Sequence, residues 1–148
     1  VRYVSAAGHV CGLLIMGAEV TLCGPPNLIP PFIKDLGVNV NTNVDEVIEW
    51  ADALNVLRIQ RERMGLGLIP SIREYRAMFG ITQERLDHHK KEIVIMHPGP
   101  MNRGVEIDGT VADGDQAIIL NQVLNGVASR MAILYLLCGG KFSEEDES

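Results

Sequence analysis

Short apolar runs alternate with stretches of helical periodicity along most of the chain. The runs rich in β-branched and other apolar residues predict strands at residues 1–5, 18–23, 38–40, 54–57 and 93–96. The segments between them carry a helical period, or a glycine or capping residue that marks a helix end. Because strand and helix alternate, the pattern predicts an α/β fold: a doubly wound, mostly parallel, Rossmann-like sheet of about five strands, with helices on both faces.

Capping signals locate the individual helices, which we expect at residues 6–16, 44–51, 72–79, 83–89 and about 116–138. Asn43 precedes the second of these as a predicted N-cap, and Thr82 precedes the fourth. Ser71 followed by Glu74 forms a capping box at the start of the third. Each of these residues offers a side-chain oxygen to backbone N–H groups that the first helical turn leaves unpaired.

The last predicted helix is unusually apolar. One stripe along it holds Leu120, Val123, Leu124, Val127, Met131, Leu134, Tyr135 and Cys138. Near its end Ile133, Leu136 and Leu137 extend the apolar surface round most of the circumference. A sheet covers only one face of such a helix, so we expect a second surface and predict self-association through it. The polar segment 108–115 before it is expected to serve as a hinge for helix exchange.

A stiff turn follows the strand that ends at His97. Pro98 and Pro100 bracket Gly99, and proline fixes φ whereas glycine adopts backbone angles closed to other residues. Ligands of open parallel sheets bind beyond the carboxyl ends of the strands, so this turn and the polar pair Asn102 and Arg103 after it are candidates for a site. The alternative is an ordinary exit from a strand into a loop.

The strand ending at Leu57 also runs out into polar residues. It places Arg58 and Gln60 two positions apart, on the same side for as long as the chain stays extended. A guanidinium pairs with a carboxylate through two parallel hydrogen bonds, and a glutamine amide donates and accepts beside it. These two residues are therefore a candidate carboxylate site. The alternative is a solvated charged face, because Arg61, Glu62 and Arg63 follow directly.

Composition limits the possible functions. The chain has 148 residues, of which 47% are hydrophobic and 22% charged, as expected for one domain over residues 1–140 followed by an acidic tail, 141–148. The net charge of −6 argues against a nucleic-acid partner. No apolar run reaches the roughly 18 residues of a membrane span, and no signal-peptide pattern is present, so we expect no membrane association and a cytoplasmic location. Cys11, Cys23 and Cys138 are predicted to be reduced core thiols rather than metal ligands.

Several segments in register resemble the aspartate-binding half of bacterial aspartate carbamoyltransferases. They are residues 17–22, 24–26, 57–64, 70–75, 97–107, 111–114 and 125–132. The resemblance covers nearly the whole chain after about residue 10 and favours the aspartate enzymes over their ornithine-using relatives, whose corresponding turn is built around a cysteine. The segment at residues 4–9 departs from the family pattern: it is shortened and lacks the arginines expected there.

The resemblance implies roles for particular residues. Arg58 and Gln60 would bind L-aspartate, and the backbone of Gly99 and Pro100 would contact the carbamoyl-phosphate side of the pocket. Glu62, Arg63 and His97 would support these groups. The reaction would join carbamoyl phosphate and L-aspartate to give N-carbamoyl-L-aspartate and phosphate, the pyrimidine-pathway step, with no metal or cofactor.

The resemblance also implies that half of the site is missing. The phosphate-binding Ser-Thr-Arg-Thr motif of the carbamoyl-phosphate domain does not occur in the sequence, nor do its catalytic histidine and lysine. We therefore expect no catalytic residue in this chain, no activity from the chain alone, and carbamoyl phosphate as a partner only when that domain is supplied.

Two other interpretations stay open at the level of sequence. A degenerate or engineered carbamoyltransferase-like domain could serve as a binding or oligomerisation module. An unrelated nucleotide-binding domain is the second, since Gly8 and Gly12 lie between two predicted strands. Against it, the G-x-G-x-x-G spacing is absent and no acidic residue ends the second strand.

Overall fold

The computed structural model of the 148-residue chain describes residues 2–5, 10–60 and 71–139. Its centre is a five-stranded sheet in the order β3-β2-β1-β4-β5, in which every pairing is parallel. The strands are β1 (Arg2–Ser5), β2 (Glu19–Cys23), β3 (Asn39–Asn41), β4 (Ala53–Asn55) and β5 (Val94–Met96). The predicted doubly wound parallel sheet is confirmed.

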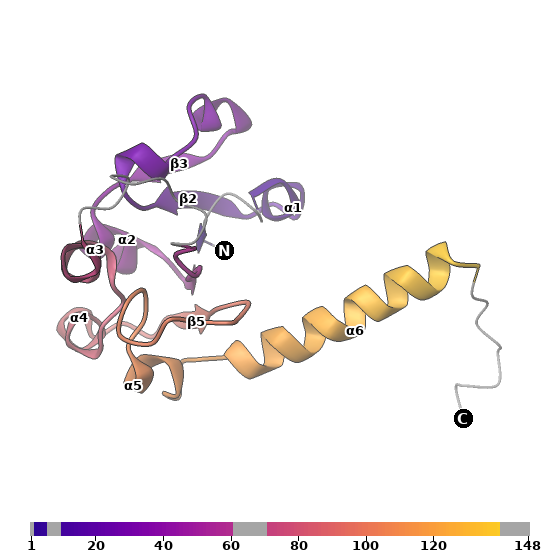
Figure 1. Cartoon of the computed structure of the whole chain (residues 1–148). Coiled ribbons are helices and arrows are strands. Elements are labelled where there is room, and N and C mark those ends of the chain that lie inside the picture. The colour runs from indigo at the N-terminus through magenta and orange to yellow at the C-terminus, as the bar shows by residue number, and fades with distance from the viewer. Residues whose placement is uncertain (1, 6–9, 61–70, 140–148) are drawn as a thin grey trace.

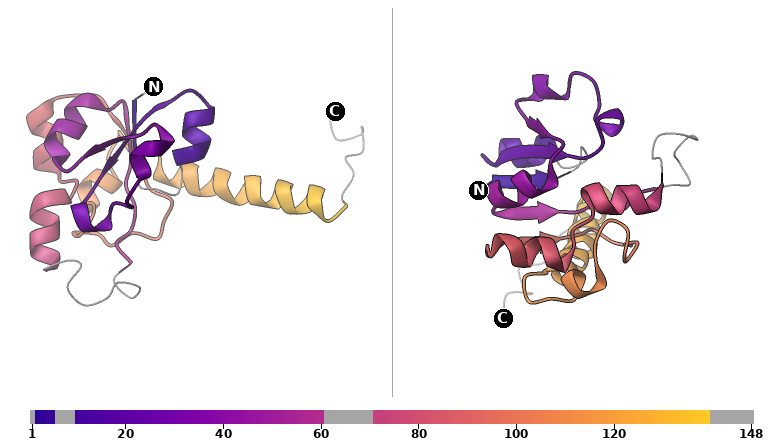
Figure 2. Two further views of the ribbon diagram at one scale, coloured as in Figure 1. Left: turned by 90° about the horizontal axis from the view of Figure 1, so that it is seen from above. Right: turned by 90° about the vertical axis from the view of Figure 1, so that its left-hand side faces the viewer.

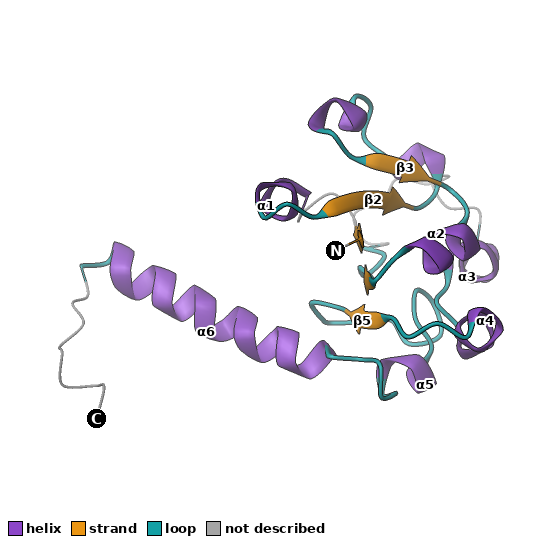
Figure 3. Cartoon of the chain, turned by 180° about the vertical axis from the view of Figure 1, so that it is seen from behind, coloured by secondary structure: helices purple, strands orange, loops and turns teal. Residues whose placement is uncertain are grey.

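Helices cover both faces of this sheet (Figures 1 and 3). They are α1 (Val10–Ile15), α2 (Val44–Trp50), α3 (Ile72–Phe79), α4 (Gln83–His89), α5 (Gly109–Ala112) and α6 (Ile119–Leu137). Two short 3-10 helices, η2 (Pro26–Leu28) and η3 (Ile33–Leu36), lie between β2 and β3. α1 lies on one face of the sheet, and α2, α3 and α4 lie on the other.

The predicted caps set the starts of three of these helices. Asn43 Oδ1 accepts a hydrogen bond from the Asp45 N–H at 3.0 Å, and Ser71 Oγ accepts one from Glu74 N–H at 3.1 Å. Thr82 Oγ1 accepts one from the Arg85 N–H at 3.3 Å. These predictions succeeded because a cap is an interaction between residues two or three positions apart.

The core divides into two clusters, one on each face. The larger one packs α2, α3 and α4 against the sheet around Ile48 and Ile95, both fully buried. The smaller one surrounds Val10 of α1 and Val20 of β2. Both clusters are mostly β-branched and other aliphatic side chains, with Phe79 in the larger one, as expected for a sheet covered on both faces.

The last helix departs from the sequence-based expectation. α6 leaves the body of the domain at its first turn and extends away from the sheet (Figures 1 and 2). Ile119 is buried, but Leu120 is 83% exposed and Leu137 79% exposed. The expected packing of one helix face on the sheet is therefore wrong. The polar segment 108–115 is also no open linker, because it contains α5 with Val111 and Ala112 buried.

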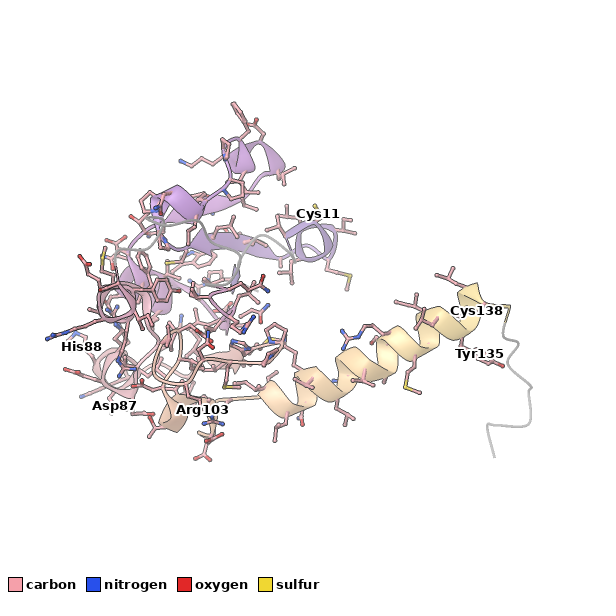
Figure 4. All side chains as sticks on the ribbon, in the orientation of Figure 1. Cys11, Asp87, His88, Arg103, Tyr135 and Cys138 are labelled. Atoms are coloured by element: carbon pink, nitrogen blue, oxygen red, sulfur yellow. The ribbon has the colours of Figure 1, made fainter. Side chains whose placement is uncertain are left out.

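The cysteine prediction was partly wrong as well. Cys11 on α1 and Cys138 at the end of α6 are exposed, and only Cys23 is partly buried. All three are free thiols, as expected. Cys11 and Cys138 lie on apolar helix surfaces that the described part of the chain leaves uncovered (Figure 4).

Candidate functional site

The carboxyl ends of β4 and β5 bring the two candidate segments together. The strands are neighbours with Asn55 opposite Met96, and the Val56 N–H continues the pairing to Met96 O at 2.9 Å. β4 also lies beside β1, the point from which the strand order runs outward in both directions. In open α/β sheets this switch point is where ligands bind. The segment 56–60 and the turn 97–100 therefore leave the sheet at its expected binding edge.

The segment after β4 is irregular rather than extended strand. β4 ends at Asn55, two residues before the predicted Leu57, so the argument that Arg58 and Gln60 share a side because they lie on one strand does not hold. Both side chains are partly buried at the sheet edge. Glu62 and Arg63, which are predicted to support Arg58 and Gln60, lie outside the described residues.

The turn after β5 has the geometry that its composition predicts. Gly99 has φ +65°, a conformation that L side chains rarely adopt, and the peptide bond to Pro100 is cis. The Gly99 N–H donates to His97 Nδ1 at 2.9 Å, and the His97 side chain is fully buried. Because Nδ1 accepts this hydrogen bond, the proton of the neutral ring is on Nε2.

A buried carboxylate lies on the other side of the histidine. Glu106 is 0% exposed, and its Oε1 lies 3.6 Å from His97 Nε2. The same oxygen accepts a hydrogen bond from the Asn102 N–H. Burial raises the pKa of Glu106, but the neighbouring His97 ring and hydrogen bonds from Asn102 and from the Glu106 N–H outweigh it, so the pKa lies below its usual value. The carboxylate is thus held ionised inside the turn.

Asn102 joins this turn to the segment after β4. Its Nδ2 donates to Glu106 Oε2 and to the carbonyl oxygen of Ile59, at 3.3 Å in each case. Ile59 lies between Arg58 and Gln60, so one side chain bridges the two halves of the candidate site. Arg103, the next residue, points away from this edge (Figure 4) and pairs with Asp113 at 2.6 Å.

The first turns of α6 close the same edge. Gln122 Nε2 donates to Asn55 Oδ1 at 3.3 Å, and Asn55 is buried at the end of β4. A side-chain methyl of Val123 lies 3.6 Å from where a Cβ on Gly99 would stand. Ile95 also forms a parallel bridge with Ala117, directly before the helix. The sheet edge and the start of α6 therefore form one packed unit.

A half-open cavity of about 240 Å³ lies at the carboxyl ends of the strands. Its lining is mostly apolar and includes Val47, Leu54 and Phe79, with Asn55 and Arg58 as polar members. Cys23 also lines it, and burial raises the pKa of this thiol to about 11, so the thiol is protonated near neutral pH. A ligand there would meet a guanidinium beside an apolar wall.

The sequence named the turn and Arg58 as candidates but not Glu106, which the structure buries against His97. Glu106 is flanked by Val105 and Ile107. An acidic residue between two apolar residues is the signal that could have identified it. Among the described residues no group of His, Cys, Asp or Glu could hold a metal ion. No helix of the described part is long and apolar enough to span a membrane.

Fold and site together define a doubly wound α/β domain with a candidate small-ligand site at the switch point of its sheet. A sequence model described as the Asp/Orn binding domain of aspartate/ornithine carbamoyltransferase matches residues 6–137. The chain therefore belongs to this family of carbamoyltransferase domains.

Two curated relatives are particularly similar. The aspartate carbamoyltransferase catalytic subunit of Gemmatimonas aurantiaca is 58% identical over 136 residues, which are 92% of this chain and 43% of the relative. That of Carboxydothermus hydrogenoformans is 55% identical over 139 residues, 93% of this chain and 45% of the relative. The chain thus spans less than half the length of the curated relatives it matches.

Solved structures agree with the fold. The aspartate transcarbamoylase of Trypanosoma cruzi in complex with carbamoyl phosphate is 26% identical with a TM-score of 0.69, covering 90% of this chain and 48% of that one. The ornithine carbamoyltransferase of Pyrococcus furiosus, 19% identical, has a TM-score of 0.72 and covers 95% of this chain and 50% of that one. At that identity the second likeness concerns the fold alone.

Proposed function

We propose that this chain is the aspartate-binding half of an aspartate carbamoyltransferase. The observation that carries the proposal is the meeting of the Arg58 segment and the Gly99–Pro100 turn at the switch point, joined through Asn102. Family membership supplies the class of reaction, and the relatives at 50% identity or more are named as aspartate enzymes. A cytoplasmic location and a role in pyrimidine biosynthesis accompany this proposal.

In this proposal Arg58 binds a carboxylate of L-aspartate. Its guanidinium offers paired donors, and the partly buried position strengthens the pairing relative to bulk water. Gln60 supplies a further hydrogen bond. The backbone of Gly99 and Pro100 forms the wall toward carbamoyl phosphate, and buried His97 fixes that wall by accepting the Gly99 N–H. Glu62 and Arg63 would support the arginine from outside the described residues.

The reaction forms a bond between the aspartate nitrogen and the carbamoyl carbon and breaks the bond from that carbon to the phosphate oxygen. The amine loses a proton, and phosphate leaves with the bonding electron pair. Such a reaction depends chiefly on orientation and on stabilising the charge that develops. This chain would orient the aspartate, and a carbamoyl-phosphate domain would hold the other substrate and supply the catalytic groups. No metal or cofactor takes part.

The proposal is tested by titrating the chain with succinate, an unreactive dicarboxylate, while following backbone amide shifts. We expect weak binding that moves residues near Arg58 and Pro100 first. Arg58→Ala should abolish it, since losing one partner of a charge pair costs on the order of 2 to 5 kcal/mol. Arg73→Ala, at an exposed arginine on α3, is the matched control. Shifts confined to the region of Gly12, or stabilisation by a dinucleotide, would favour the nucleotide-binding interpretation.

We further propose that the chain associates with itself through α6. Ten residues of this helix are exposed large hydrophobic side chains, among them Ile133, Leu136 and Leu137. Arg130 is the one charged residue between Ile119 and Leu137. A surface of this size is unstable in water unless another surface covers it. When only this chain is present, a second copy of it covers the apolar surface of α6. The two copies either pack their α6 helices together or exchange them.

A further inference from the structure

We infer that Asn102 and Glu106 are positioning residues, which hold the carboxylate-binding segment at a fixed distance from the Gly99–Pro100 turn. The inference rests on the proposed function, because its consequence for ligands requires that Arg58 binds one. Neither residue is assigned contact with substrate. They act on Arg58 and Gln60 through the carbonyl of Ile59, which lies between them.

The contacts form a connected series, in which hydrogen bonds join Ile59, Asn102 and Glu106, and a longer electrostatic contact joins Glu106 to His97. Asn102 Nδ2 has two hydrogens, and its two acceptors, Ile59 O and Glu106 Oε2, both lie at 3.3 Å. Glu106 Oε1 takes the Asn102 N–H and faces His97 Nε2 at 3.6 Å. His97 Nδ1 in turn takes the Gly99 N–H at 2.9 Å. A displacement of the turn is therefore transmitted to Ile59 through residues that are buried or partly buried.

Burying the ionised carboxylate of Glu106 costs free energy. This cost indicates that Glu106 does more than close the loop between residues 97 and 107. Glu106 is ionised at 0% exposure, and an ion is stable in such a place only when it is hydrogen-bonded on several sides. A neutral side chain would close the same loop without that cost. Ionised Glu106, by contrast, accepts from two donors of Asn102 at once, which fixes the amide orientation and directs the remaining hydrogen at Ile59 O.

Exchanging the amide of Asn102 and the carboxylate of Glu106 distinguishes two roles of this pair: closing the loop and holding the carbonyl of Ile59. In Asn102→Asp with Glu106→Gln, the new glutamine amide donates to the new aspartate, and the Asn102 N–H keeps an acceptor. The link between the two residues is therefore restored with the same net charge. The carbonyl of Ile59, however, now faces a carboxylate oxygen and loses its donor. Each single substitution instead places two acceptors or two donors against each other.

We expect the double variant to unfold within a few degrees of the wild-type midpoint and to bind succinate about threefold to tenfold more weakly, the factor for one lost hydrogen bond. In the ligand-free protein, the amide resonances of Ile59 and Gln60 should already be displaced. Arg103→Ala, which breaks the adjacent ion pair with Asp113, is the control and should leave both readouts unchanged. Where Asn102→Asp alone fails to fold, Asn102→Ala takes its place and should weaken succinate binding similarly.

Two results would overturn the inference: unmoved resonances at residues 58–60 in the double variant, or wild-type succinate affinity despite moved resonances. Absence of succinate binding by the wild-type chain, together with no effect of Arg58→Ala, would instead refute the proposed function. The ligand-free resonances would still decide whether Asn102 and Glu106 hold the segment in place.

Discussion

Glu106 is a charged residue in an environment that disfavours charge. It is a carboxylate at 0% exposure, facing buried His97 and donors from Asn102. The charge of Glu106 also acts on the Tyr75 hydroxyl. Burial and this charge both raise the pKa of Tyr75. The stability of the turn should therefore depend on the protonation of this one side chain.

The pKa of Glu106 is lowered in the folded chain, so its contribution to stability is present above its unfolded pKa. That contribution is lost as the pH falls through the folded value. We expect Glu106→Gln to flatten the acid side of a plot of unfolding free energy against pH, measured by urea denaturation from pH 7 to pH 3. Asp113→Asn, at an exposed carboxylate paired with Arg103, is the control for surface charge. Parallel curves for wild type and Glu106→Gln would contradict the assignment.

At the scale of elements, capping and packing act separately. α2 has seven residues, so its formation depends on its cap and on the burial of Val47 and Ile48. Asn43 serves it twice, by accepting from the Asp45 N–H and by donating from Nδ2 to Glu46 at 2.9 Å. α6 is the opposite case, a long helix of 19 residues whose apolar surface the described domain leaves exposed.

Asn43→Ala should lower the free energy of unfolding by about 1 kcal/mol, because an N-cap acceptor is removed. Asn43→Ser keeps an acceptor at the same place and should retain most of the stability. Chemical denaturation of the two variants measures the difference. Equal stabilities would mean that the bond to Glu46, which both variants lose, provides the whole effect.

The exposed surface of α6 leads to a second prediction at this scale. Light scattering at micromolar concentration should give a mass above that of one 16.2 kDa chain. Leu136→Glu should shift it toward the monomer, since a charge in an apolar interface is costly to bury. Glu84→Gln on α4, an exposed position on the opposite face of the sheet, is the control. A soluble monomer unaffected by Leu136→Glu would show that no second copy covers this helix.

At the scale of the whole molecule, the fold places the candidate site at one edge of the sheet. The chain spans 43% and 45% of the two curated relatives described above. The proposed site consists of Arg58 and Gln60 on one side and the Gly99–Pro100 wall on the other. The groups that would hold phosphate have no counterpart in the sequence.

We therefore expect no carbamoyl-aspartate from the purified chain given carbamoyl phosphate and L-aspartate. Mixing with a separately produced carbamoyl-phosphate domain should restore measurable formation, and Arg58→Ala should remove it. A colorimetric assay of carbamoyl-aspartate follows both. Product from the chain alone, at a rate lost on Arg58→Ala, would contradict the proposal that half of the site is missing.

The sequence by itself determined the features that near neighbours control. The alternation of strands and helices, the caps at Asn43, Ser71 and Thr82, and the tight turn at Gly99 all depend on residues within a few positions of one another. Their physics is local hydrogen bonding and steric restriction, so a residue pattern is sufficient to predict them. The parallel sheet followed from the same alternation.

Only the tertiary structure decided which distant groups meet. Asn102 and Ile59 are 43 positions apart, and their hydrogen bond exists because β4 and β5 are adjacent in the sheet. Glu106 is also buried against His97, nine positions away, and the chain leaves the strand after Asn55; the local residue pattern predicted neither feature. The direction of α6 is also a tertiary result, since an apolar pattern specifies that a surface favours burial but not what covers it.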